Sequence, residues 1–179
     1  MPPSPRSEHQ SVVSRMNYYL LAHIEFAGLG RVYPALLDVE LSYNNIVQPD
    51  VLVISNEHLD RDAGTRIIGT ADLVVEIASP STSRHDLGAK LNAYAQAGVP
   101  EYWVVAPGSQ TVELLVLKDG AYDSYGLFSG SAVLPSTIVP SMTCTVQQFF
   151  SRPEIIPRPC KKERDDRWQP PPVIPLLLA

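Results

Sequence analysis

The sequence predicts an α/β fold, of the kind also classed as α+β, in which a mixed central β-sheet is flanked by helices. Three observations predict it. Residues 71–79 and 101–107 are near-continuous apolar runs, typical of strands that are covered on both faces. Residues 84–97, which lie between them, have helical spacing, and a strand, helix, strand order favours a right-handed crossover between parallel strands. Residues 111–128 read as an antiparallel hairpin around a KDG turn, so the sheet is mixed.

The first part of the chain is predicted to hold one helix, two β-rich segments and a loop. Residues 1–8 are expected to be a disordered lead. Residues 9–27 have apolar side chains at helical intervals and are followed by a glycine that stops the helix. Residues 32–43 and 47–55 are β-rich. The polar, glycine-containing residues 55–70 predict a long loop between two strands.

The helix after the central strand has clear boundaries in the sequence. Ser83, with Asp86 three residues later, resembles a capping box at the start of a helix. The helix is expected over residues 84–97, and Gly98 is the residue expected to end it. A short closing helix is predicted over residues 144–150.

Composition and charge restrict the classes of function. The formal net charge is −5 and the pI is near 5.3, so the chain has no global electrostatic attraction to nucleic acid or to anionic membranes. The first ten residues lack the apolar core of a signal peptide, and the longest late apolar run, VIPLLLA, is too short to span a bilayer. The two cysteines, Cys144 and Cys160, have no metal-ligand spacing and suit a reducing compartment. A cytoplasmic location is therefore expected.

One charged residue interrupts the apolar run of the central strand. An ionised Glu76 would cost several kcal/mol there unless a cation or hydrogen bonds compensate it. Asp50 begins another apolar strand, and Lys90 lies on the helix that follows Glu76. Two carboxylates on adjacent strands can share one Mg²⁺, which uses one or two carboxylates together with carbonyl, water and phosphate oxygens. A nearby lysine can hold a water for attack on phosphorus, while the metal stabilises the charge of the transition state.

These residues lie in a longer stretch that resembles a known family. PD before an apolar strand, followed by a Glu in the next apolar strand, is similar to the PD-(D/E)XK nuclease pattern. More closely, QPDVLVI and DLVVEIASPSTSRHDLGAKLNAYAQAGVPEYWVVAP resemble the Uma-two family of restriction-endonuclease-like proteins, over about residues 9–150. The usual lysine position of the pattern, two residues after the Glu, is Ala78 here, and the resemblance points to Lys90 instead. An N-terminal hairpin segment that the family usually carries is expected to be missing.

The resemblance implies a restriction-endonuclease-like domain over residues 9–157. It also implies a Mg²⁺-dependent nuclease, with Mn²⁺ as an alternative ion, that hydrolyses the phosphodiester bonds of nucleic acid, DNA being the expected substrate. Asp50 and Glu76, with the backbone carbonyl of Ile77, would bind the metal. Lys90 would position or polarise the attacking water.

Each of these residues also has a structural explanation. Asp50 can be a turn residue at a strand entry, and Glu76 can belong to a buried ion pair. Lys90 can pair with Asp86, four residues earlier on the helix, and Asp86 itself can be a helix cap. Asp86 and Tyr94, on the same helix face as Lys90, are expected to lie behind the catalytic residues. The alternatives to an active nuclease are a catalytically degenerate relative that binds nucleic acid or protein, and a structural subunit whose sheet edge pairs with a partner chain.

Two further expectations concern assembly and the end of the chain. A homodimer is expected, because the hairpin over residues 111–128 offers a strand edge and because cutting both strands of DNA commonly needs two sites. Residues 158–179 are rich in proline, which fixes φ and removes a hydrogen-bond donor. They are expected to form an extended, polyproline-like arm outside the core.

Overall fold

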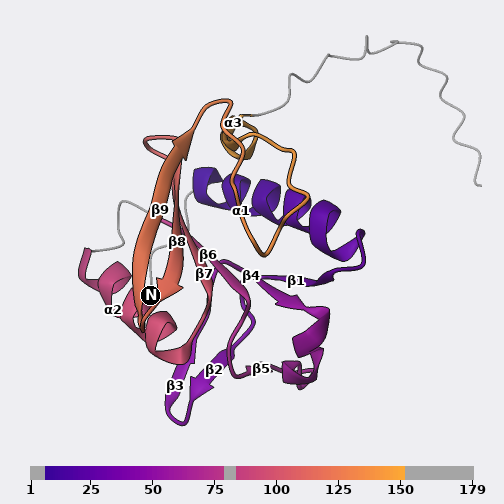
Figure 1. Ribbon diagram of the computed structural model, residues 1–179, viewed down its shortest axis with the longest axis vertical. Helices are drawn as coiled ribbons and strands as arrows, with labels where there is room; N and C mark the ends of the chain where they lie inside the picture. The colour runs from indigo at the N-terminus through magenta and orange to yellow at the C-terminus, as the bar shows by residue number, and fades with distance from the viewer. Residues whose placement is uncertain (1–6, 79–83, 152–179) are drawn as a thin grey trace, which may run out of the picture.

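A six-stranded mixed β-sheet forms the centre of the computed structural model (Figure 1). The structure describes residues 7–78 and 84–151, with the backbone alone for residues 84–87. The strands lie in the order β1 (Gly30–Pro34), β4 (Val51–Ser55), β6 (Leu73–Ile77), β7 (Glu101–Ala106), β8 (Thr111–Lys118) and β9 (Ala121–Ser129). Strands β6 and β7 are parallel, and the other neighbouring pairs are antiparallel. The predicted mixed sheet and its parallel crossover are thereby confirmed.

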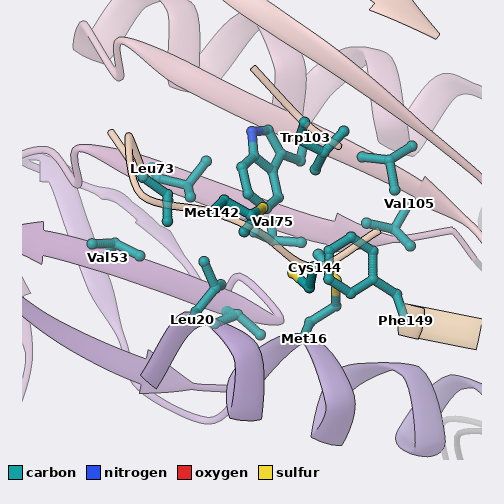
Figure 2. Packing of buried hydrophobic residues seen from close by; sticks show 14 of the residues in the cluster. Met16, Leu20, Val53, Leu73, Val75, Trp103, Val105, Met142, Cys144 and Phe149 are labelled. Atoms are coloured by element: carbon teal, nitrogen blue, oxygen red, sulfur yellow. The ribbon is translucent and has the colours of Figure 1, made fainter. Parts of the chain in front are cut away.

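One face of this sheet is covered by helix α1 (Ser7–Leu20). Figure 2 shows Met16 and Leu20 of α1 beside Leu73 and Val75 of β6 in one apolar cluster. All four side chains are at most 1 % exposed, and burying a side chain of this size stabilises the fold by about 1.5–3 kcal/mol. The cluster therefore fixes α1 against the middle of the sheet.

The opposite face carries a second apolar cluster beneath helix α2 (Arg84–Ala97). Val74 of β6 lies in this cluster with Tyr94 of α2 and Tyr102 of β7. Because successive strand residues point to opposite faces, Glu76 lies on the same face as Val74. The direction of Glu76 toward α2 thus follows from the same alternation that builds the two cores.

The predicted end of α2 is confirmed. Gly98 has φ +88°, and its N–H donates to the backbone carbonyls of Tyr94 and Ala95, each at 3.1 Å. A left-handed residue of this kind commonly ends a helix, and glycine adopts it without a steric penalty. The predicted capping box of Ser83 and Asp86 lies outside the described residues, since only the backbone of Asp86 is described.

The predicted lead of residues 1–8 needs correction at its end. Helix α1 begins at Ser7, so Ser7 and Glu8 belong to the helix. Glu8 lies in the first turn, where a negative side chain is favoured by the positive end of the helix dipole. The α-helix passes into a π-helical turn over Leu21–Glu25, and Gly28, with φ +71°, follows close to the predicted end at residue 27.

A second, smaller sheet was not predicted. Its strands are β3 (Asn45–Val47), β2 (Val39–Ser42) and β5 (Ile67–Ile68), in that order. The β-rich segment 47–55 is therefore divided between two sheets. The prediction of a long loop over residues 55–70 was wrong in part, because this segment contains a 3-10 helix, Asn56–Arg61, as well as β5. Ile67 is fully buried, and a single buried residue in a two-residue strand is too little to create a sequence pattern.

The later elements agree with the prediction. Asp119 and Gly120 have φ values of +51° and +83°, as a tight type I′ turn between two strands requires. The closing helix, α3 (Val146–Phe150), is slightly shorter than predicted and is capped by reciprocal hydrogen bonds between Thr145 and Gln148. No helix within the described ranges is long and apolar enough to cross a membrane.

A second buried carboxylate, at the start of β7, has a structural role. Glu101 is 1 % exposed. It accepts a hydrogen bond from Trp103 Nε1 at 2.7 Å, and from the backbone N–H and the hydroxyl of Thr137, both at 3.1 Å. Both of its oxygens are therefore paired with neutral donors, and the carboxylate joins β7 to the loop that contains Thr137.

We expect Glu101→Gln to lower the free energy of unfolding by about 1–3 kcal/mol, because the new amide group would face the Thr137 N–H and leave a buried donor unpaired. Urea denaturation measures the change. An unchanged midpoint would contradict the structural role.

Candidate active site

Asp50 and Glu76 lie side by side at one end of the central sheet. Strands β4 and β6 pair with Val51 opposite Val75, so the register extended by one residue places Asp50 opposite Glu76. The alternation of the strands sends both side chains to the face covered by α2. Directly opposed residues have Cβ atoms about 4.5–5.5 Å apart in an antiparallel pair. The two carboxylates that the sequence singled out therefore share one corner of the sheet.

Glu76 is buried and receives three hydrogen bonds. Its side chain is 7 % exposed. Lys90 Nζ lies 2.8 Å from each of its two oxygens, and the Tyr94 hydroxyl donates to Oε1 at 2.9 Å. The predicted convergence of Glu76 and Lys90 is present, and Tyr94 lies behind the pair as expected.

Lys90 is the group that compensates the charge of Glu76 in this structure. Burial raises the pKa of Glu76 and the nearby Asp50 carboxylate adds to the rise, whereas the Lys90 ammonium and the Tyr94 hydroxyl lower it. Burial is the largest of these effects, so the pKa stays above its ordinary value. The ion pair considered as a structural explanation for Glu76 is thus formed, and its cation is the predicted catalytic lysine.

Lys90 is more exposed to solvent than Glu76. Its side chain is 36 % exposed, against 7 % for Glu76. An ammonium group in this position can turn from the carboxylate to water or to a bound anion without itself being buried. The alternative pairing of Lys90 with Asp86 lies outside the described residues, because the Asp86 side chain is not described.

Asp50 is held by two groups at one of its oxygens. The backbone N–H of Ile77 donates to Oδ2 at 2.8 Å, and His9 Nε2 lies 3.3 Å from the same oxygen. Ile77, predicted to contribute its backbone carbonyl, therefore contacts the site through its N–H. This bond ties the entry of β4 to the end of β6 and keeps the two carboxylates together.

His9 was not among the predicted site residues. Its spacing from the other histidines is not that of metal ligands, and His9, in the first turn of α1, meets Asp50 only through the packing of α1 on the sheet. Among the described residues, no group of three or more His, Cys, Asp and Glu side chains is arranged to hold a metal ion. The acidic corner therefore offers a pair of carboxylates rather than a complete cage of protein ligands.

Three tyrosine rings pack in a row beside Glu76. The rings of Tyr94 and Tyr102 lie 5.4 Å apart, and Tyr122 lies 5.6 Å beyond Tyr102. Burial and the Glu76 carboxylate raise the pKa of Tyr94, so its hydroxyl remains a protonated donor. The Tyr94 hydroxyl therefore offers Glu76 a neutral donor from helix α2.

Comparisons with known proteins identify the family and the fold of the chain. A family model, Uma2, described as "putative restriction endonuclease", matches residues 1–147. A crystal structure described as a putative nuclease belonging to DUF820, from Anabaena variabilis, matches with a TM-score of 0.68 at 18 % sequence identity, over 83 % of each chain. At this identity the match establishes the fold, which is nuclease-like. No curated protein matches the chain. Because the family model covers most of the sequence, the chain belongs to the Uma2 family.

Proposed function

We propose that the protein is a nuclease that hydrolyses phosphodiester bonds of DNA and depends on a divalent cation, Mg²⁺ or Mn²⁺. The observation that carries the proposal is the contact of a partly exposed lysine with one of two adjacent carboxylates at one end of the central sheet. Asp50, Glu76 and Lys90 come from two strands and a helix, and the fold brings them together. Family membership supports the proposal, since the family is described as "putative restriction endonuclease".

The residues present fit a hard divalent cation. Asp50 and Glu76 offer carboxylate oxygens, which are the ligands that Mg²⁺ and Mn²⁺ prefer. Mg²⁺ is commonly bound by only one or two carboxylates, with waters and substrate phosphate completing its shell, so the absence of a third acidic ligand among the described residues suits it. When bound, the ion would neutralise developing negative charge on the phosphoryl oxygens. The Ile77 carbonyl is proposed as a further oxygen ligand.

Lys90 is proposed to hold the attacking water. Its ammonium lies at 2.8 Å from both oxygens of Glu76 and is partly exposed, so it can donate one N–H to water while remaining near the carboxylate. The water oxygen forms the new bond to phosphorus and releases a proton to the surrounding solvent, one P–O ester bond breaks, and the leaving oxygen takes a proton from solvent. The hydrogen bond from the Tyr94 hydroxyl would hold Oε1 of Glu76 in place during hydrolysis.

A cleavage assay tests the proposal. Supercoiled plasmid incubated with the full-length protein should be nicked with Mg²⁺ or Mn²⁺ and should stay intact with EDTA. Asp50→Asn should reduce the rate by at least about 100-fold, because losing the charged ligand removes several kcal/mol of transition-state stabilisation. Wild-type protein that cleaves no DNA or RNA with any divalent cation would contradict the proposal.

A binding module without catalytic activity is the second candidate. One observation favours it: Lys90 already neutralises Glu76 without a metal, as a degenerate site would require. The net charge of −5 also gives no general attraction to nucleic acid. Retention of labelled DNA by wild-type protein, with no cleavage in any metal and no change for Asp50→Asn, would favour this function.

We also propose that the protein is a homodimer joined at strand β9. This strand lies at the edge of the central sheet and leaves Tyr125 and Leu127 63 % and 68 % exposed. An unpaired edge with apolar side chains favours pairing with a second copy, and a two-fold axis would place two active sites on one duplex.

Light scattering should therefore give twice the chain mass, and Leu127→Lys should shift the protein toward monomer. Tyr43→Lys, at an 89 % exposed residue of the smaller sheet region, is the matched control and should leave the dimer intact. A wild-type mass of one chain at all concentrations would contradict the dimer.

A further inference from the structure

His9 reaches the acidic corner from the helix on the opposite face of the sheet. It lies in the first turn of α1, yet its Nε2 is 3.3 Å from Oδ2 of Asp50, and its side chain is only 16 % exposed. A histidine in an ordinary helix start would be solvated. The packing of α1 on the sheet, through Met16 and Leu20, fixes the imidazole beside this carboxylate.

The surroundings of the ring decide which nitrogen carries the proton. Nδ1 of His9 is buried and has no hydrogen-bond partner among the described residues. A neutral imidazole has one N–H and one lone pair. A buried N–H without an acceptor is costly, because it loses its hydrogen bond to water and gains none in the protein. Nε2, in contrast, faces a carboxylate that can accept a hydrogen bond. The proton therefore belongs on Nε2, and His9 acts as a donor toward Asp50.

The two contacts of Asp50 fall on the same oxygen. Ile77 N–H donates to Oδ2 from the sheet at 2.8 Å, and His9 approaches Oδ2 from α1. Two donors on Oδ2 restrict the rotation of the carboxylate, and Oδ1 receives neither of them. At 3.3 Å the His9 contact is longer than a strong charge-assisted hydrogen bond of about 2.8 Å, so its effect should be moderate.

We propose that His9 is a positioning residue, which orients the Asp50 carboxylate so that Oδ1 is presented to the cation. This inference rests on the proposed function, since it assigns His9 to the same metal-binding corner. It makes α1 part of the active site and not only part of the core. Groups that orient metal ligands in this way typically change metal affinity by about 10- to 100-fold, and the long contact places the expectation at the lower end.

The test measures Mn²⁺ binding to the full-length protein by isothermal titration calorimetry, without substrate. The side chains of Gln and Asn place an amide N–H near the positions of histidine Nε2 and Nδ1, respectively. His9→Gln should therefore retain the Mn²⁺ affinity to within about twofold, whereas His9→Ala and His9→Asn should weaken it by about tenfold. His23→Gln, which replaces a histidine bonded to Tyr19 and Thr143 away from the site, should have no effect.

The outcomes separate this inference from the proposed function. If wild-type protein binds no Mn²⁺, both the metal site and the role of His9 are refuted. If wild type binds and His9→Ala binds equally well, only the role of His9 is refuted. If His9→Gln loses as much affinity as His9→Ala, and the electron spin echo of bound Mn²⁺ carries nitrogen modulation, then His9 is itself a ligand and the positioning role is wrong. Thermal melting of each variant confirms that the protein is folded.

Discussion

Glu76→Gln should reduce metal-dependent cleavage by at least about 100-fold and should also raise the melting temperature. The loss of activity is expected because the amide cannot offer a charged oxygen to the cation. The gain in stability is expected because an ionised carboxylate at 7 % exposure is costly, while Lys90 is exposed enough to be solvated once its partner is neutral. Each kcal/mol gained should raise the melting temperature by about 2–4 °C for a chain of this size.

The pH dependence of this gain has a defined sign. Burial raises the pKa of Glu76 in the folded state. A carboxyl group with a raised folded pKa contributes stability below its unfolded pKa, and this contribution is lost as the pH rises through the folded pKa. The difference between Glu76→Gln and wild type should therefore grow from about pH 4 upward, the ordinary range for Glu, and then level off.

Glu101→Gln is the matched control for this prediction, since it makes the same substitution at the other buried glutamate. It should destabilise the fold and spare cleavage, the reverse of Glu76→Gln on both counts. A Glu76→Gln protein that is less stable than wild type and still cleaves DNA would show that Glu76 is a structural residue.

Lys90→Met should lower the stability of the fold, in contrast to Glu76→Gln, and should also remove cleavage. Without the ammonium, the described residues leave Glu76 with the Tyr94 hydrogen bond and the repulsion of Asp50. Removing one partner of a fully buried ion pair costs about 3–5 kcal/mol. Because Lys90 is 36 % exposed, we expect about 2 kcal/mol here, measured by urea denaturation at pH 7.

A double-mutant cycle isolates the pair. In the Glu76→Gln background, Lys90→Met should cost less than about 0.5 kcal/mol, because no buried charge remains to be compensated. Equal costs in the two backgrounds would mean that the side chain of Lys90 stabilises the fold through its apolar stem and not through Glu76.

The sequence predicted the central elements because their signals are strong and local. The strand around Glu76 is apolar throughout, α2 has regular spacing, and Gly98 ends it where a left-handed residue is required. A carboxylate in such a strand is conspicuous, so Glu76 could be found without coordinates. Lys90 was predicted through the family resemblance, because its spacing from Asp86 by itself favoured an ion pair along the helix.

The remaining features depend on contacts between distant segments. His9 and Asp50 are neighbours only because α1 packs on the sheet, and no local pattern records this. The small sheet was missed because β5 has two residues and pairs in parallel with β2. No sequence pattern singled out Glu101, and its structural role appears only when Trp103 and Thr137 are placed around it. The arm expected over residues 158–179 lies outside the described residues.

The measurement that tests the central claim most directly is an anomalous difference map from a crystal of wild-type protein soaked in Mn²⁺. The proposal predicts a peak at the acidic corner, within about 2.2 Å of one oxygen each from Asp50 and Glu76, with Lys90 displaced from Glu76. The same soak of Glu76→Gln should give a weaker peak or none. A fully occupied Glu76–Lys90 pair, without a peak at saturating Mn²⁺, would contradict the claim that these carboxylates bind a catalytic cation.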